Sequence, residues 1–174
     1  MHWQAMGKVV SAAAIAVAMV SAPARMAAQS GSDTVLKAAD AQKLLPASVF
    51  YDGQSATTQL RNSGGVKFAD GHFVLATLVD TSGYSTGIAA KYQGYFITEV
   101  PLQIGGQSLP VGVYGIGFVA DNKFVVTDVG AHDVLTVSSS NDAEIKRPMP
   151  LQVIADPAGG FRLYAGRKYV SFSR

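Results

Sequence analysis

The stretch over residues 100–129 constrains the fold of this chain more than any other. Two apolar runs, residues 111–120 and 124–129, flank the polar dipeptide Asn122-Lys123. Apolar runs joined by a short polar turn are typical of a β-hairpin. The stretch therefore predicts an antiparallel sheet.

Strand and turn signals continue over the rest of the chain after residue 47. The run over residues 73–79 is apolar on both alternating faces, so we expect a central strand that is covered on both sides. Residues 62–65 (NSGG) are expected to form a turn. About eight to ten strands in all predict an all-β fold, either an antiparallel β-sandwich or a small closed β-barrel.

Three of the expected turns share one pattern, in which Ala-Asp is followed after a few residues by Phe. Asp70, Asp121 and Asp156 hold the acidic position. We expect each carboxylate to cap its turn, Gly or Asn to accept a positive φ, and the Phe to return to the core. The unequal spacing of the three turns argues against a repeat protein.

Residues 34–45 are the one segment with a helical composition. Ala and Leu dominate it, Ser32 or Asp33 can cap its start, and Pro46 would end it. We therefore expect one short N-terminal helix over residues 34–45, packed across an open end or a face of the sheet.

The first residues are typical of a cleaved secretory signal. Lys8 supplies a positive charge, residues 9–20 form an apolar run, and a small-x-small motif ends at Ala24. The apolar run is too short to span a bilayer, which needs roughly 20 residues. We expect a signal peptide over residues 1–28, cut after Ala24 or after Ala28.

Export implies that a single β-rich domain over residues 29–174 works in the periplasm or outside the cell. The absence of cysteine excludes disulfides, thiolate metal sites and the lipid anchor of a lipoprotein. The 14 basic and 12 acidic residues nearly cancel, so we expect no nucleic-acid binding. An outer-membrane barrel would fit the length, but the expected strands are too short and too often apolar on both faces. We expect no membrane insertion after signal cleavage.

A G-x-S-x-G motif surrounds Ser85 and is the pattern that presents the nucleophile of many hydrolases. His132 lies downstream of it. The carboxylates available to orient the histidine are Asp121, Asp128 and Asp133. The α/β-hydrolase fold needs alternating helices and parallel strands, which the sequence does not predict. We therefore expect a flexible, glycine-containing loop in which the Ser85 hydroxyl caps a turn. A serine hydrolase is the alternative.

One strand of the predicted hairpin has a nearly bare face. Tyr114 lies on its bulky face, whereas Gly115 and Gly117 leave the other face open to a backbone, a helix or a flat ligand. Tyr95 and Glu99 belong to the expected strand before it, where Glu99 has apolar neighbours. We expect helix packing or aromatic infill on this face. The alternative is a ligand, and the residues predicted to contact it are Tyr95, Glu99, Tyr114, Gly115 and Gly117.

Metal binding is not expected. His72 and His132 are the only histidines after the expected signal, and no H-x-H or H-E-x-x-H spacing is present. Nothing in the sequence indicates a cofactor.

Residues 105–114 (GGQSLPVGVY) resemble a G-x-x-L-P-x-G-x-Y phrase of small exported β-domains from environmental bacteria. These families carry no assigned activity. The resemblance implies an exported β-domain and no catalytic residue.

The sequence thus predicts a secreted or periplasmic binding or structural module without catalysis. We expect its ligand to be a small hydrophobic or glycan molecule held in a barrel or groove, or its partner to be another exported protein. The alternative is a serine hydrolase that uses Ser85 with His132.

Overall fold

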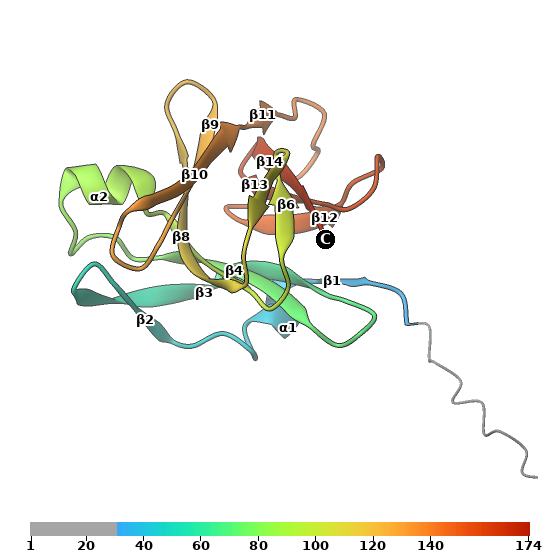
Figure 1. Ribbon diagram of the computed structural model, residues 1–174, viewed down its shortest axis with the longest axis horizontal. Coiled ribbons are helices and arrows are strands. Elements are labelled where there is room, and N and C mark those ends of the chain that lie inside the picture. Colours follow the sequence, from blue (N-terminus) through green and yellow to red (C-terminus); the bar gives the residue numbers. More distant parts are fainter. Residues whose placement is uncertain (1–30) are drawn as a thin grey trace, which may run out of the picture.

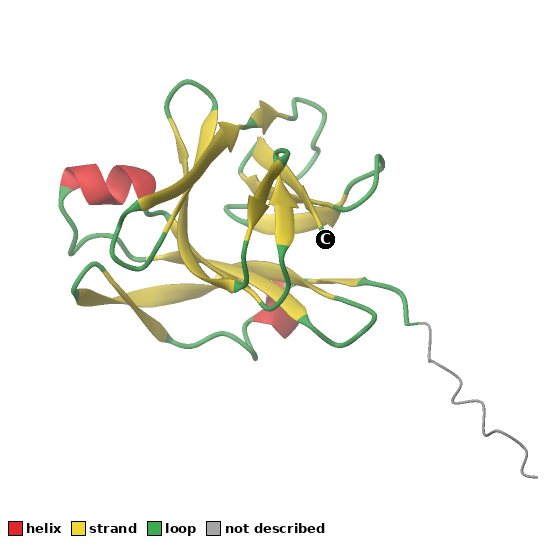
Figure 2. Ribbon diagram, viewed as in Figure 1, coloured by secondary structure: helices red, strands yellow, loops and turns green. Residues whose placement is uncertain are grey.

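A computed structural model describes residues 31–174 of the chain (Figure 1). The predicted signal peptide over residues 1–28 and its two candidate cleavage positions lie outside the described residues. Strands make up nearly all of the regular structure, and two short helices interrupt them (Figure 2). The all-β prediction is therefore confirmed.

In chain order the elements are β1 (Thr34–Leu36), α1 (Ala38–Ala41), β2 (Ser48–Tyr51), β3 (Gln54–Lys67), β4 (Phe73–Val79), α2 (Thr86–Lys91), β5 (Gly94–Thr98), β6 (Leu102–Ile104), β7 (Gln107–Leu109), β8 (Gly112–Val119), β9 (Lys123–Thr127), β10 (Asp133–Ser138), β11 (Ser140–Asn141), β12 (Gln152–Ala155), β13 (Phe161–Ala165) and β14 (Lys168–Ser173).

The larger sheet contains eight antiparallel strands. Seven of them follow the order β1-β3-β4-β5-β8-β9-β10, and β2 pairs with the first part of β3. The apolar run over residues 73–79 forms β4, which lies between β3 and β5. The prediction of a central strand there is confirmed.

Strands β8 and β9 form the predicted hairpin, with Val119 paired to Lys123 next to the turn. The turn residues Asp121 and Asn122 have φ values of 58° and 51°. Asp and Asn tolerate this left-handed conformation better than other non-glycine residues, so they suit the three-residue loop between Val119 and Lys123. The turn therefore sets the register of the hairpin.

The smaller sheet contains six strands, in the order β12-β13-β14-β6-β7, with β11 paired to β14. The β6–β7 hairpin lies between β5 and β8 in the chain and leaves the larger sheet to join the smaller one (Figure 1). No helix among residues 31–174 is long and apolar enough to cross a membrane.

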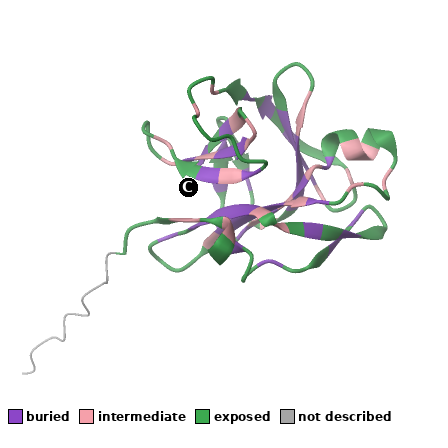
Figure 3. Ribbon diagram, turned by 180° about the vertical axis from the view of Figure 1, so that it is seen from behind, coloured by how far each residue is buried: buried purple, intermediate pink, exposed green. Residues whose placement is uncertain are grey.

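The two sheets enclose a shared core, to which Phe96 and Phe124 contribute from the larger sheet and Leu163 and Phe172 from the smaller. Buried residues accordingly follow the strands of both sheets (Figure 3). The arrangement is sandwich-like, and the strands of residues 31–174 do not close into a barrel. The closed-barrel alternative is therefore wrong.

The helix predicted over residues 34–45 is also wrong. Strand β1 occupies the start of this segment and pairs with β3, and α1 contains only four residues. So short a helix gains little from cooperative hydrogen bonding, whereas β1 satisfies backbone groups along β3. Strand pairing therefore prevails over the helical composition. The rest of the segment still packs on the sheet, because Ala41 and Leu45 are buried against Leu75.

The described part of the chain has 14 strands, more than the predicted eight to ten. Four of them, β1, β6, β7 and β11, contain only two or three residues. Residues 62–65 do not form the predicted turn but lie inside β3, just after an irregularity in its pairing with β4. A side chain at Gly65 would overlap the carbonyl of Val74, so this glycine permits close approach of two strands.

Candidate functional site

An apolar groove opens where β1 and α1 meet β12. Its volume is about 510 Å³. Residues 35–39 line one side, Met149 and residues 151–155 line the other, and Ser63 of β3 lies between them. The two sides thus come from opposite ends of the described chain.

The groove forms because β1 and β12 are edge strands of different sheets. Among the described strands, β1 pairs only with β3 and β12 pairs only with β13, although β1 and β12 contact each other (Figure 1). Gly64 in β3 allows the backbone of β12 to approach, since a side-chain carbon there would lie 3.2 Å from the Val153 nitrogen. The sheets therefore meet along a seam without a hydrogen-bonded ladder.

The lining of the groove is mostly aliphatic. Met149 and Ile154 remain 46% and 37% exposed, although both are large and apolar. The Ser63 hydroxyl donates to the Leu60 carbonyl at 2.6 Å, so its hydrogen bond is already made. Of the described lining residues, Lys37 is the only charged one and none is aromatic. The groove therefore offers apolar contact with one positive charge at its side.

A second feature is a tyrosine cluster of Tyr51, Tyr84 and Tyr92, packed beside α2. The rings of Tyr51 and Tyr92 stack with centroids 3.6 Å apart and planes 8° apart, and Tyr84 meets both edge-on. Burial raises the pKa of all three hydroxyls. The Tyr92 hydroxyl is buried without a hydrogen-bond partner among the described residues.

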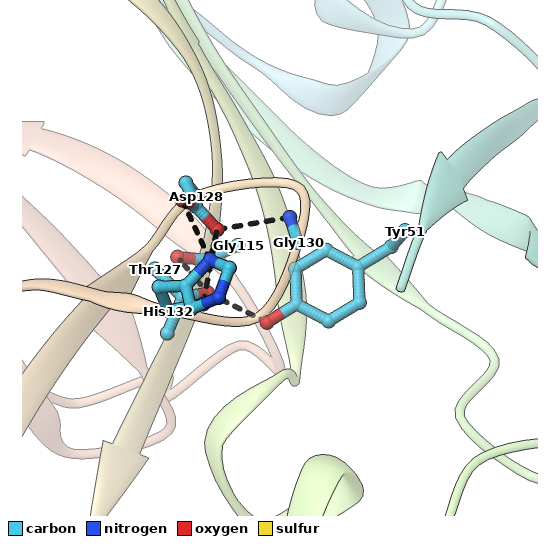
Figure 4. A network of polar contacts seen from close by, with 6 residues as sticks. All are labelled: Tyr51, Gly115, Thr127, Asp128, Gly130 and His132. Carbon is cyan, nitrogen blue, oxygen red and sulfur yellow. Dashed lines mark hydrogen bonds and ion pairs between the residues drawn. The ribbon is translucent and has the colours of Figure 1, made fainter. Parts of the chain in front are cut away.

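Gly115 lies directly beneath the tyrosine cluster. A side-chain carbon at this position would lie 2.6 Å from both Thr127 Oγ1 and the Tyr51 ring, and 2.9 Å from the Tyr92 ring. The Tyr51 and Thr127 hydroxyls are 2.7 Å apart, and Thr127 donates to the Gly115 carbonyl at 3.3 Å (Figure 4). The missing side chain of Gly115 is what allows this packing.

Gly117 likewise lets the end of α2 pack closely against β8. A side-chain carbon there would overlap the carbonyl of Lys91, at the end of the helix. Just beyond, the Gln93 side chain accepts from the Phe118 N–H at 3.0 Å and donates to the Phe118 carbonyl at 3.1 Å. The face predicted to be bare is thus covered by α2 and the tyrosine cluster.

The five residues predicted to contact a ligand do not converge. Tyr95 pairs with Gly115 and is half-buried beside the tyrosine cluster. Tyr114 lies on the opposite face, within the main core, because successive residues of a strand point to opposite sides. Glu99 follows β5 and accepts the N–H of Phe73 at 2.8 Å. A ligand at these positions stays a prediction.

Two of the three residues of the hydrolase alternative lie in contact. The Asp128 carboxylate lies 3.1 Å from His132 Nδ1 and also accepts the backbone N–H groups of His132 and Gly130, each at 2.9 Å (Figure 4). Hydrogen bonds from the His132 backbone and side chain lower the pKa of Asp128. Ser85 instead caps α2, where its Oγ accepts the Ile88 N–H at 3.4 Å. Within residues 31–174, no hydrogen bond joins Ser85 to His132.

Metal ligands do not gather in this part of the structure. Among residues 31–174, no three His, Asp or Glu side chains come together as a metal site would require.

Sequence reasoning missed the groove, because its two sides are far apart in the chain and the first was expected to be helical. The available signals were the apolar residues after Pro150 and the Gly64-Gly65 pair, which marks close backbone approach as often as a turn. Neither signal reveals which strands become neighbours.

No protein-family model matches this chain, and no match was found among curated proteins or among solved structures. Its function must therefore be inferred from the geometry of the chain itself.

Proposed function

We propose that this protein is an exported, non-catalytic binding module that holds a small hydrophobic ligand in the groove between β1, α1 and β12. The observation that carries the proposal is the groove itself, which measures about 510 Å³ and has an aliphatic lining. Ligand sites are typically mostly apolar cavities of roughly 300–1,000 Å³ with a few polar groups. The groove fits that description in size and in chemistry.

Export is supported by the sequence. Lys8, the apolar run over residues 9–20 and the small residues ending at Ala24 are typical of a secretory signal. The resemblance of residues 105–114 to exported β-domains also supports export. An exported module would meet its ligand in the periplasm or outside the cell.

Native mass spectrometry of the protein purified from its own host tests this proposal. We expect a small ligand to remain bound to the wild-type chain and to be absent from Ala155→Trp, because Ala155 is an exposed lining residue and an indole there would fill the groove. The matched control is Ala158→Trp, which changes an exposed alanine in the β12–β13 turn. Equal ligand loss in both variants, or wild-type protein without any ligand, would contradict the proposal.

The alternative is a serine hydrolase that uses Ser85 with His132 and Asp128. The contact between Asp128 and His132 favours it, since a carboxylate that orients the histidine is one part of a catalytic triad. The capping hydrogen bond of Ser85 opposes it, because the nucleophile must instead contact the histidine. Labelling of the folded protein by a fluorophosphonate, lost in Ser85→Ala, would establish the hydrolase.

A further inference from the structure

We propose that the ligand of the groove is an anionic amphiphile, a single alkyl chain that ends in a carboxylate, with the carboxylate held at Lys37. This inference rests on the proposed function, because it names the class of ligand that the same groove would take. Three features of the described residues support it: the charge of the lining, the engagement of nearby acids, and the absence of aromatic rings.

Lys37 lies between β1 and α1 and is exposed to solvent. Its backbone carbonyl accepts the N–H groups of Asp40 and Ala41, whereas its side chain makes no cap hydrogen bond. No ion pair to Lys37 is present among the described residues. The ammonium group is therefore available to a bound anion without loss of an internal contact.

Acidic side chains near the groove are already engaged elsewhere. Asp40 pairs with Lys43 at 3.0 Å, one turn along from Lys37. Asp156, which directly follows the lining residue Ala155, pairs with Arg162 at 2.9 Å. With these carboxylates compensated, the charge at the side of the groove is that of Lys37, which favours an anion over a cation.

The lining also indicates that the apolar part of the ligand is an alkyl chain without rings. Sugar and aromatic rings are commonly bound against aromatic side chains, and none lines this groove. Its polar side chains are few, and the Ser63 hydroxyl is already bonded to Leu60. The branched side chains of Leu36, Val153 and Ile154 instead suit a flexible alkyl chain, which gains affinity only from buried methylene groups.

The affinity of such a ligand should depend on chain length in a defined way. Each methylene that enters the groove should tighten binding roughly fourfold, up to the length at which the groove is full. The exposed ion pair with Lys37 should add roughly two- to fivefold for a carboxylate over the alcohol of the same length.

The test is to measure, by isothermal titration calorimetry, the binding of octanoate, decanoate and dodecanoate, of the matching alcohols, and of dodecyltrimethylammonium. All are used below the concentrations at which they form micelles. We expect the carboxylate to bind more tightly than its alcohol. This preference should vanish in Lys37→Ala and Lys37→Gln and persist in Lys123→Ala, which removes an exposed lysine that lies outside the lining and in none of the ion pairs of the described residues. Lys37→Arg should restore it.

The possible outcomes separate the two proposals. Equal binding of alcohol and carboxylate, lost in Ala155→Trp, would overturn the assignment of Lys37 and leave the hydrophobic groove standing. Tighter binding of dodecyltrimethylammonium than of dodecanoate would also overturn the assignment of Lys37 and leave the hydrophobic groove standing. Binding of none of these probes by a folded protein would overturn both. Because Lys37 is exposed and its side chain makes no internal bond, thermal melting should show that its variants remain folded.

Discussion

Replacement of Gly115 by alanine should lower the free energy of unfolding by about 2–4 kcal/mol. The new methyl group would lie 2.6 Å from Thr127 Oγ1 and from the Tyr51 ring. Carbon contacts need roughly 3.5 Å, so buried groups must move by about an ångström. Overpacking of this kind typically costs about 1–3 kcal/mol. Disruption of the 2.7 Å hydrogen bond between Tyr51 and Thr127 adds about 1 kcal/mol.

Urea unfolding, followed by tyrosine fluorescence and by far-ultraviolet circular dichroism, measures this loss. The matched control is Gly87→Ala in α2, where no other group lies within 4 Å of the new carbon. That control should be neutral or should stabilise the protein by up to about 1 kcal/mol, since alanine is the better helix former. A loss below about 0.5 kcal/mol in Gly115→Ala would refute the claim that Gly115 is required by the tyrosine cluster.

The same variant separates a structural from a binding role for this face. Gly115 lies beneath the tyrosine cluster and does not line the groove. The folded fraction of Gly115→Ala should therefore bind the groove ligand with unchanged affinity. Loss of ligand binding by protein that remains folded would instead favour the binding face predicted from the sequence.

Three further predictions concern other parts of the molecule. Tyr92→Phe should leave the free energy of unfolding unchanged or raise it by up to about 1 kcal/mol, because it removes a buried hydroxyl without a partner and keeps the ring stack. Tyr51→Phe should instead lower it by about 1 kcal/mol, because it removes the hydrogen bond to Thr127. Urea unfolding of both variants checks this. The hydrogen-bonded Arg162 lowers the pKa of Asp156 from 3.8 to about 2, so this carboxylate stabilises the fold above pH 3.8 and loses that effect as the pH falls towards 2. Asp156→Asn should accordingly be less stable than the wild type at neutral pH, and this difference should shrink between pH 4 and pH 2 in unfolding curves; a difference independent of pH would contradict the role of the charge. Fluorophosphonate should not label the folded wild-type protein, because the Ser85 hydroxyl caps α2; labelling that disappears in Ser85→Ala would contradict this.

The parts of the fold that local chemistry determines could be predicted from the sequence. The β8–β9 hairpin follows from two apolar runs around a turn whose residues accept positive φ. Two of the three Ala-Asp turns behave as expected, because Asp70 accepts the His72 N–H and Asp156 accepts the Ala158 N–H. In these cases the residues that determine the structure are neighbours in the chain.

The wrong predictions concern segments whose structure is determined by contacts with distant parts of the chain. Residues 34–36 join β3 as a strand, although the segment over 34–45 has a helical composition. Residues 62–65 remain extended, because Gly65 lies against the β4 backbone and Gly64 against β12. In both places tertiary pairing overrides the local preference. No single-sequence pattern identifies the partner strand.

In the candidate site, too, local features could be predicted from the sequence, whereas contacts between distant segments could not. The bare face at Gly115 and Gly117 was visible from alternation alone. The groups that cover it come from two other segments, Tyr51 from β2 and Tyr92 with the end of α2. The groove combines residues from both ends of the domain, so no motif could mark it.

A map of amide chemical-shift changes on addition of dodecanoate would show where an alkyl carboxylate binds. We expect the largest changes to cluster at Leu36, Lys37, Val153 and Ile154, on both sides of the groove, and to disappear in Ala155→Trp. Changes centred instead on Gly115, or no changes at saturating dodecanoate, would contradict this expectation.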